Sequence, residues 1–190
     1  MIVCAYYTKN TPYEKIILNL EKSLISLGLE YKFMGYESRG SWVANCAIKP
    51  GFILQCLEET GDEVLYVDAD AVIRKKPDIV FDEAVAVCYK NHEDGRRQLM
   101  SGTIFVKQAG RSVIETWAEE QRRRPTVWDQ ETLDCVIKRD SVPVCVLPQG
   151  YTKIFDNGWE RGQETTVYIE HFQASRKNKG KVNQAGGVKK

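Results

Sequence analysis

The chain has 190 residues, 43% of them hydrophobic and 28% charged, with a net charge of +1, a composition that suits one soluble domain with a buried core. No apolar run approaches the roughly 20 residues of a membrane-spanning helix, and the start, MIVCAYYTKN, lacks the basic and long apolar segments of a signal peptide. We therefore expect no membrane span and a cytoplasmic location, in a bacterium or, for a viral protein, in the host cell.

The first half of the chain alternates apolar strands with amphipathic helices. The expected elements are, in order, strand 1–7, helix 12–27, strand 31–36, helix 43–59 and strand 63–70. Strands that are apolar throughout and separated by helices are typical of a parallel sheet covered on both faces. We therefore predict an α/β fold, a single Rossmann-like domain with a mostly parallel central sheet flanked by helices on both faces.

The second half continues with strands and helices before a polar end. Strands are predicted at 84–90, 103–107, 142–148 and 166–172, and helices at 111–123 and 128–138. Residues 176–190, RKNKGKVNQAGGVKK, are rich in glycine and lysine and lack apolar periodicity, which is typical of a mobile segment. The predicted organisation is one domain at 1–172 and a basic, mobile tail at 173–190.

The charge is unevenly distributed along the chain. Six of the 27 Lys and Arg residues follow Glu170 and no acidic residue does, so residues 1–170 hold 21 basic against 26 acidic residues, a net charge of −5. An acidic body with a basic tail indicates either a tail that contacts phosphate or a solvated chain end, and composition does not choose between the two.

Polar residues gather at the predicted carboxyl ends of the strands, where parallel sheets bind ligands. Tyr6, Tyr7 and Thr8 end the first strand, and the segment VLYVDADAVI places Asp68 and Asp70 at the end of the third. Residues i and i+2 of an extended strand point to the same side. Both carboxylates could therefore bind the same metal ion, either Mg²⁺ or Mn²⁺, because these two ions prefer oxygen ligands. A solvated turn is the alternative interpretation of the two acids.

The string DADAVI resembles the motif DxDx[TV][VIL] of haloacid-dehalogenase-like phosphatases. In that family Asp68 would be the nucleophile and Asp70 a general acid and base. Those enzymes, however, carry the motif on their first strand and have acidic metal ligands after a later strand. Here the motif is on the third strand, and the later acids Asp129 and Asp134 fall in a helical pattern.

A second resemblance extends over nearly the whole chain. The segments that carry it are, in order, the strand that ends at Tyr6, Tyr7 and Thr8, then GSWVANCAIKPGFI, VLYVDADAVI, MSGTIFV, WDQETL, LPQGY and EHFQASRK. In this order and spacing they resemble nucleotide-sugar glycosyltransferases of the GT-A type, in a small bacterial or viral form. The resemblance implies a GT-A-like domain whose DxD motif binds a divalent cation and the diphosphate of a nucleotide sugar.

The resemblance also assigns the metal and the nucleotide to particular residues. Asp70 would bind the metal through the diphosphate, Asp68 would share the metal or reach the ribose, and His171 would complete the metal site. The residues expected to contact the nucleotide or its diphosphate are Tyr6, Tyr7, Thr8, Lys49, Asp68, Ser175, Arg176, Lys177 and, further along, Lys179. Buried tyrosines, a surface lysine at position 49 and a structural histidine are the alternative interpretations.

Asp129 is the best remaining candidate for catalysis. It begins a helical pattern in WDQETL, so it is either a helix N-cap or, as the resemblance implies, the acceptor base or a ligand of donor sugar hydroxyls. Gln130 would be its neighbour on the sugar. The expected sugar and acceptor pocket has four members, Ser101, Gly102, Thr103 and Trp159. The stereochemistry of the transfer stays open.

The sequence thus predicts a metal-dependent glycosyltransferase that moves a sugar from a nucleoside-diphosphate sugar, a UDP-sugar in first place, to a hydroxyl acceptor. Mn²⁺ or Mg²⁺ is the expected cofactor. A glycan, a lipid-linked sugar, a protein and a hydroxymethylated DNA base all stay open as acceptors. The basic residues expected to favour DNA are Arg96, Arg97, Arg122, Arg123 and Arg124, with the tail. A phosphatase that uses Asp68 and Asp70, and a nucleotide-binding module without catalysis, remain alternatives.

Overall fold

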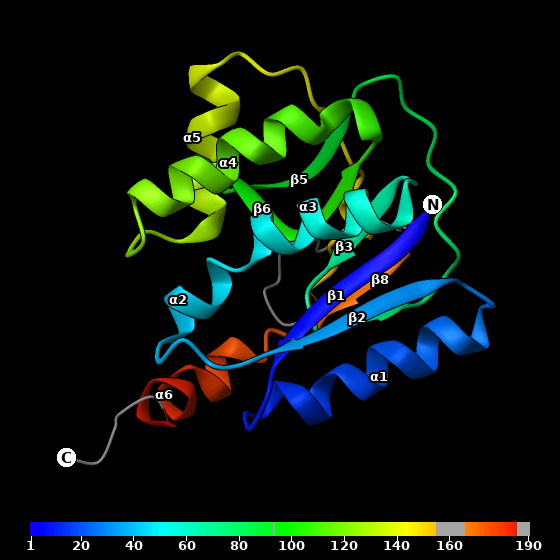
Figure 1. The fold of residues 1–190 in the computed structure, drawn as a ribbon. Helices are drawn as coiled ribbons and strands as arrows, with labels where there is room; N and C mark the ends of the chain where they lie inside the picture. The colour runs from blue at the N-terminus through cyan, green and yellow to red at the C-terminus, as the bar shows by residue number, and fades with distance from the viewer. Residues whose placement is uncertain (93, 155–165, 186–190) are drawn as a thin grey trace.

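The computed structural model describes residues 1–92, 94–154 and 166–185 of the chain, and Figure 1 shows their arrangement. The elements in chain order are β1 (Ile2–Thr8), α1 (Tyr13–Ser26), β2 (Tyr31–Tyr36), α2 (Trp42–Cys46), α3 (Lys49–Thr60), β3 (Val64–Val67), β4 (Ala71–Ile73), β5 (Val85–Asn91), β6 (Arg97–Val106), the 3-10 helix η1 (Gln108–Gly110), α4 (Arg111–Arg123), α5 (Asp129–Arg139), β7 (Cys145–Val146), the 3-10 helix η2 (Gln149–Tyr151), β8 (Ile169–His171) and α6 (Ser175–Ala185).

Six strands form the central sheet in the order β2-β1-β3-β6-β5-β7. β1 is parallel to β2 and β3, β5 is parallel to β7, and β6 is antiparallel to both of its neighbours. Five of the six strands therefore run in one direction, which confirms the predicted α/β fold with a mostly parallel sheet. β4 and β8 form a separate antiparallel pair, in which Ala71 is the partner of His171.

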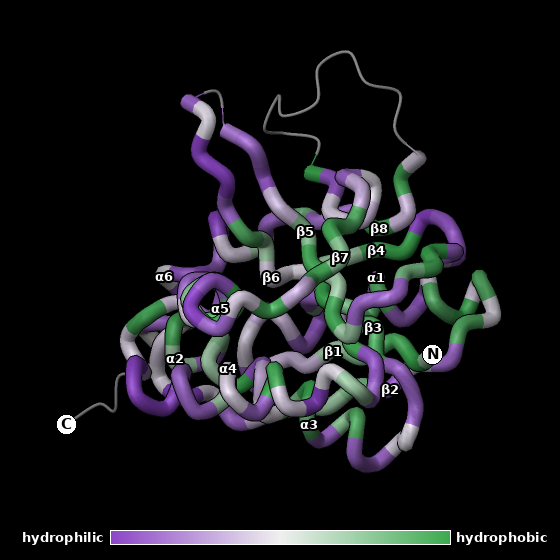
Figure 2. The backbone as a smooth tube through the Cα atoms, turned by 90° about the horizontal axis from the view of Figure 1, so that it is seen from above, coloured by the Kyte–Doolittle hydropathy of each residue, from purple (hydrophilic) through white to green (hydrophobic). Residues whose placement is uncertain are grey.

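Helices cover both faces of the sheet, as predicted. α1 lies on one face, and α3 and α4 lie on the other, with α5 packed against α4 (Figure 1). Each face has its own buried cluster, with Leu20 and Leu24 of α1 in one and Ile53 and Ile114 of α3 and α4 in the other. Burial on both sides explains why the strands are apolar at nearly every position. Figure 2 shows hydrophobic segments in β3, β4 and β8 and hydrophilic ones along α5 and α6.

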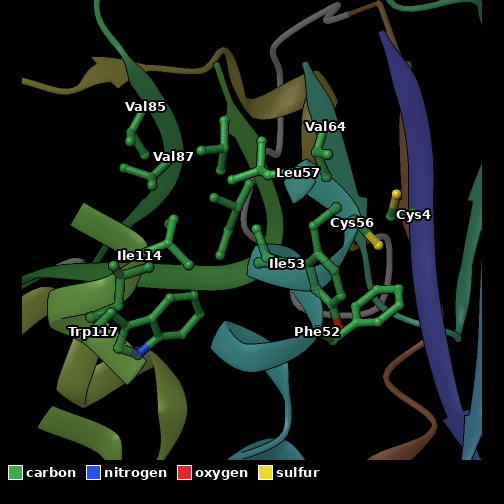
Figure 3. Packing of buried hydrophobic residues seen from close by; sticks show 14 of the residues in the cluster. Cys4, Phe52, Ile53, Cys56, Leu57, Val64, Val85, Val87, Ile114 and Trp117 are labelled. Atoms are coloured by element: carbon green, nitrogen blue, oxygen red, sulfur yellow. The ribbon is translucent and has the colours of Figure 1, made fainter. Parts of the chain in front are cut away.

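Trp117 of α4 joins this core to the start of α5. Its side chain is fully buried and lies beside Ile114 in the cluster of Figure 3. The indole Nε1–H donates to the carbonyl of Asp129 at 3.1 Å and to the hydroxyl of Thr132 at 3.0 Å. Removing a buried aromatic side chain of this size costs about 3–5 kcal/mol. The position of Asp129 therefore depends on the packing of the core.

The helix predicted at 43–59 is two helices, α2 and α3. Ser41 begins α2, because its Oγ accepts a backbone N–H of the first turn at 3.1 Å. Pro50 lies in the first turn of α3, where its missing N–H costs no helical hydrogen bond. The start signals of both helices were present in the sequence, but the apolar pattern continues across the break. As a result, Lys49 begins a new helix and is buried.

Ser175–Ala185 form α6, a helix within the segment that the sequence predicted to be a basic, mobile tail and in which it indicated no helix. Asn178 and Val182, four residues apart, are buried, and Asn183 Oδ1 accepts the backbone N–H of Trp42 in α2 at 2.8 Å. Contacts with distant segments stabilise a helix whose own sequence does not predict it. The division of the chain at residue 172 remains a prediction. None of the helices in the described part of the chain is long and apolar enough to cross a bilayer.

Candidate active site

A cavity of about 420 Å³ opens at the carboxyl ends of β1 and β3, bordered by residues of β6, α2, α5 and α6. Ligands of mostly parallel sheets bind at such ends. Nearly all the predicted site residues line it. Thr103 and Lys177 are the exceptions among the described residues, and Trp159 lies outside the residues that the structure describes.

Asp68 and Asp70 are brought together by a turn and not by an extended strand. β3 ends at Val67, and the N–H of Ala71 donates to the carbonyl of Asp68 at 2.9 Å, which closes the turn. The last bond to β6 is the one from the Asp68 N–H to the carbonyl of Gly102, at 2.9 Å. The expectation of alternate positions on one strand was therefore wrong in geometry, although both aspartates line the cavity.

His171 is the last residue of β8, and Thr103 fixes its ring from behind. Thr103 Oγ1 lies 2.9 Å from Nε2 of His171 and donates its hydrogen to the carbonyl of Tyr151 at 2.8 Å. Since the hydroxyl hydrogen goes to a group that only accepts, the Thr103 oxygen accepts from Nε2–H of the ring. Nδ1 then keeps a lone pair for a ligand. Thr103 is fully buried, so it lies behind the site and not in the predicted sugar and acceptor pocket.

Asp68, Asp70 and His171 form a cluster that fits a divalent cation, because one ligand atom of each lies within 4.8 Å of the others. Burial lowers the pKa of His171 in spite of the two carboxylates, which keeps the imidazole neutral at neutral pH. Burial raises the pKa of Asp70, and the charge of Asp68 adds to the rise. Burial also acts to raise the pKa of Asp68, but the charges of Lys49 and His171 and the hydrogen bonds from Tyr66 and Lys49 together lower it.

Gly102 of β6 leaves the space that this cluster needs. A Cβ at this position would lie 3.0 Å from Cε1 of His171, 3.2 Å from its Nδ1 and 3.1 Å from Oδ2 of Asp68. These distances are shorter than ordinary van der Waals contacts. The absence of a side chain at Gly102 therefore leaves room for the side chains of His171 and Asp68.

Lys49 and Asp129 form a buried ion pair beside this cluster. Nζ of Lys49 lies 2.6 Å from Oδ2 of Asp129 and 3.1 Å from Oδ1 of Asp68. It also donates to the carbonyl and the hydroxyl of Ser101, both at 3.1 Å. Burial alone would lower the pKa of Lys49, but the charges of Asp129 and Asp68 raise it, so the amine stays charged. Asp129 begins α5, where the helix dipole favours a carboxylate, and Gln130 next to it lines the cavity.

The three residues that end β1 differ in what they offer to a ligand. Tyr6 is buried, and its hydroxyl donates to a backbone carbonyl of α2 at 2.9 Å. Thr8 is buried, and its hydroxyl lies 2.9 Å from that of Thr11, whose own hydrogen goes to the Thr8 carbonyl. Tyr7 is half-buried, and its ring lies over Gly35 of β2, where a Cβ would come within 2.8 Å of it. Of the two tyrosines, Tyr7 has the ring that a base can reach.

The start of α6 lies against Asp70. The N–H of Ala174 donates to Oδ2 of Asp70 at 2.6 Å, and Gln173 has a left-handed φ of 51° where the chain leaves β8. The positive end of the α6 dipole therefore adjoins the cavity. This contact joins residues more than a hundred positions apart.

The polar residues of α6 are divided between the cavity and the solvent. Ser175 and Arg176 line the cavity, whereas Lys177 is exposed and does not. Lys179 does line it. Of the basic residues of α6 predicted for the diphosphate, Arg176 and Lys179 thus line the cavity.

Trp42 and Trp128, which the sequence reasoning missed, stand at the rim of the cavity. Their rings meet edge to face with centroids 5.4 Å apart, and Nζ of Lys179 lies 4.6 Å and 4.8 Å from the two centroids. The Trp128 side chain is 36% exposed. Both residues stand inside segments that carried the resemblance, GSWVANCAIKPGFI and WDQETL, so a large aromatic residue beside a motif was the available signal.

Comparisons with known proteins agree with this geometry. A family model of nucleotide-diphospho-sugar transferases matches residues 41–184. A glycosyltransferase involved in the glycosylation of the major capsid of PBCV-1 has a TM-score of 0.71 at 15% identity, over 98% of this chain and 99% of that chain. The galactosyltransferase LgtC, in complex with donor and acceptor sugar analogs, has a TM-score of 0.57 at 12% identity, over 97% and 96%. No curated protein sequence matches the chain.

Proposed function

The chain belongs to the nucleotide-diphospho-sugar transferase family and is a glycosyltransferase of the GT-A fold; on this premise we propose that it moves a sugar from a UDP-sugar to a carbohydrate hydroxyl, with one bound Mn²⁺ ion. The observation that carries the proposal is the cluster of Asp68, Asp70 and His171 in the cavity. A phosphatase is not favoured, because the family match is to transferases and Oδ1 of Asp68 is already bound by Tyr66 and Lys49.

The donor set supports Mn²⁺ more than Mg²⁺. Mg²⁺ is bound almost entirely by oxygen, whereas a site that offers an imidazole nitrogen beside carboxylates suits a transition metal. Asp68, Asp70 and Nδ1 of His171 would hold the ion. When bound, the ion would stabilise the negative charge that develops on the leaving diphosphate.

Residues of β1 and of α6 that line the same cavity support a nucleoside diphosphate as part of the donor. Tyr7 at the end of β1 offers its ring to the base. Ser175, Arg176 and Lys179 offer a hydroxyl and positive charge to the phosphates at the start of α6, where the helix dipole also favours an anion. Lys177 was predicted for this role, and its exposed position outside the cavity makes Lys179 the better candidate.

Asp129 and Gln130 are the groups proposed to act on the sugar. Both line the cavity, and Asp129 is separated from the metal cluster only by the ammonium group of Lys49. The Asp129 carboxylate would either take the proton of the acceptor hydroxyl or bind hydroxyls of the donor sugar. Gln130 would hydrogen-bond the sugar beside it.

The rim of the cavity supports a glycan as acceptor. Trp42 and Trp128 offer aromatic surface beside the polar residues of the cavity, a combination that suits the mixed apolar and polar faces of a sugar ring. The similar PBCV-1 enzyme is involved in glycosylation of a capsid, and LgtC was solved with an acceptor sugar analog. We therefore prefer a glycan to the other acceptors that the sequence left open.

A DNA acceptor has weaker support. Three of the arginines expected to contact phosphates form ion pairs with neighbouring acids, namely Arg96 with Asp94, Arg123 with Glu119 and Arg124 with Glu120. Paired arginines have less free positive charge to offer to a phosphate backbone.

The test is a panel of nucleotide sugars incubated with the purified chain and MnCl₂, MgCl₂ or EDTA, with release of the nucleotide as the readout. We expect hydrolysis of a UDP-sugar that needs Mn²⁺ and stops with EDTA, and transfer to a simple glycoside acceptor. Turnover that EDTA does not affect would contradict the metal site. No turnover of any donor would contradict the proposed activity, and transfer to a hydroxymethylated oligonucleotide alone would contradict the acceptor class.

A further inference from the structure

We propose that Lys49 and Ser101 are positioning residues that bind one oxygen of the Asp129 carboxylate and thereby direct the other oxygen into the cavity. The inference rests on the proposed transfer activity and goes beyond it, because Lys49 was expected to contact the nucleotide and Ser101 to contact a sugar. The two residues come from different elements, Lys49 from the start of α3 and Ser101 from β6.

The first observation is that both contacts fall on the same oxygen. Oδ2 of Asp129 lies 2.6 Å from Nζ of Lys49 and accepts the hydroxyl hydrogen of Ser101 at 2.7 Å. Ser101 and Lys49 also contact each other, through the Ser101 hydroxyl and carbonyl, both 3.1 Å from Nζ. The three side chains are buried. A carboxylate held by two donors on one oxygen has little freedom to rotate.

The second observation concerns the other oxygen of Asp129. Oδ1 takes part in none of the hydrogen bonds or ion pairs found among the described residues, and it is not among their buried polar atoms that lack a partner. Among the described residues, Oδ1 is thus an acceptor that no side chain or backbone group binds, on a residue that lines the cavity. Oδ1 is thus the atom that can meet a substrate hydroxyl.

The third observation is that Lys49 has no N–H left for a ligand. An ammonium group has three donors, and Nζ has four acceptors within 3.1 Å: Oδ2 of Asp129, Oδ1 of Asp68, and the hydroxyl and carbonyl of Ser101. A phosphate would have to displace one of these contacts. Lys49 therefore acts through Asp129 and Asp68, and it fixes the distance between the proposed sugar-binding acid and the metal cluster.

The experiment compares Ser101→Ala, Asp129→Asn and the double variant in the metal-dependent hydrolysis of the UDP-sugar found in the donor panel. We expect Ser101→Ala to lower kcat about 10²-fold, because small misplacements of a catalytic group have effects of this size. The KM for the donor should change by less than about 3-fold, because Ser101 makes no contact with it. Asp129→Asn should lower kcat about 10³-fold.

The double variant provides the decisive comparison. If Ser101 acts only by holding the Asp129 carboxylate, then removing the Ser101 hydroxyl should not lower kcat further in Asp129→Asn. The kcat of the double variant should therefore match that of Asp129→Asn within about 2-fold. Ser101→Thr keeps the hydroxyl and should stay within about 5-fold of the unaltered chain. Ser112→Ala, on the exposed surface of α4, is the matched control and should leave kcat unchanged.

Three results would overturn the inference. One is a kcat for Ser101→Ala close to that of the unaltered chain. The second is a loss of kcat in the double variant that equals the product of the two single losses. The third is an effect of Ser101→Ala on KM alone. Both of these results indicate that Ser101 contacts the substrate directly. Absence of metal-dependent turnover in the unaltered chain would overturn the proposed function, and the role of Lys49 and Ser101 with it. Metal-dependent turnover in the unaltered chain, together with losses of kcat that multiply in the double variant, would overturn only the inference.

Discussion

The cavity holds two acidic regions that differ in how their negative charge is balanced. Asp129 has a buried cation of the protein itself, since Nζ of Lys49 lies 2.6 Å from its Oδ2. Asp70 has no Lys or Arg partner among the described residues; its Oδ2 accepts the backbone N–H of Ala174, and the ring of His171 beside it is kept neutral by burial. Asp68 lies between the two regions, with Oδ1 bound to Lys49 and Oδ2 near His171.

The difference shows in which region a lysine of the protein balances the negative charge and in which region an added cation could do so. Burial raises the pKa of Asp70, with Asp68 as the next cause, as expected for a carboxylate without a nearby cation. Burial acts on Asp68 as well, but the pKa of Asp68 is lowered by the combined effect of Lys49, His171 and the hydrogen bond from Tyr66. Lys49 therefore balances the charge of Asp129, the acid proposed to act on the sugar, whereas Asp70 has a negative charge that the proposed metal ion would balance. Variants that remove one cation or the other test this difference.

The largest effect is expected from Lys49→Met, which removes the internal cation. Two carboxylates then lack their partner in a buried place, and breaking a buried ion pair costs about 3–5 kcal/mol of the free energy of unfolding. Urea unfolding followed by circular dichroism measures the loss. Lys15→Met, at an exposed position of α1, is the control and should stay within about 0.5 kcal/mol. A loss below about 1 kcal/mol in Lys49→Met would show that the ammonium group does not stabilise the fold.

The next effect is expected from Asp70→Asn, which removes a ligand of the external cation. We expect metal-dependent hydrolysis of the donor to fall about 10²- to 10³-fold, equivalent to about 3–4 kcal/mol, because an amide is a weaker metal ligand than a carboxylate. Stability without metal should not fall, since the variant removes a buried negative charge. Calorimetric titration with MnCl₂ and urea unfolding are the measurements. Asp82→Asn, an exposed acid, is the control, and unaltered Mn²⁺ affinity in Asp70→Asn would contradict the metal site.

A smaller effect is expected from Gly102→Ala, which disturbs the metal side and leaves Lys49 in place. The added Cβ would meet the ring of His171 and Oδ2 of Asp68 at 3.0–3.2 Å, so both ligands must shift. Misplaced ligands lower metal affinity by about 10- to 100-fold. Gly51→Ala is the matched control, because a Cβ at Gly51 has no heavy atom within 4 Å. Equal Mn²⁺ affinity in the two variants would show that the space beside Gly102 is not needed for the ion.

The smallest effect is expected from Lys179→Met on α6. The lysine lies at the cavity beside Trp42 and Trp128, and its loss should weaken binding of UDP in the presence of Mn²⁺ about 3- to 5-fold, or about 1 kcal/mol. Lys177→Met, two residues earlier and exposed, should change the affinity by less than about 2-fold. The reverse order in a calorimetric titration would restore the sequence-based assignment of Lys177 to the diphosphate.

Apolar periodicity in the sequence was sufficient to predict the helices that bury one face and the strands that are buried on both. The strands β1 and β2 and the helices α1 and α4 were predicted close to their observed bounds, because apolar periodicity reports directly on burial. Apolar periodicity did not predict the break between α2 and α3, just before Lys49, because the apolar pattern continues from one helix into the next. It also failed at α6, where a few contacts with α2 stabilise a segment of mostly polar residues.

The sequence by itself determined the α/β class, the position of the aspartates after a buried strand, and many of the residues at the cavity, because strand ends and turn residues are local properties of the chain. Only the tertiary structure decided which of those residues contact one another and which face the cavity. It placed Lys49 between Asp68 and Asp129, put Thr103 behind His171, and brought Lys179 rather than Lys177 to the cavity. The contacts of Lys49 with Asp129 and of Thr103 with His171 join residues 80 and 68 positions apart. Side-chain packing between distant elements fixes such contacts, and no periodicity along the chain records them.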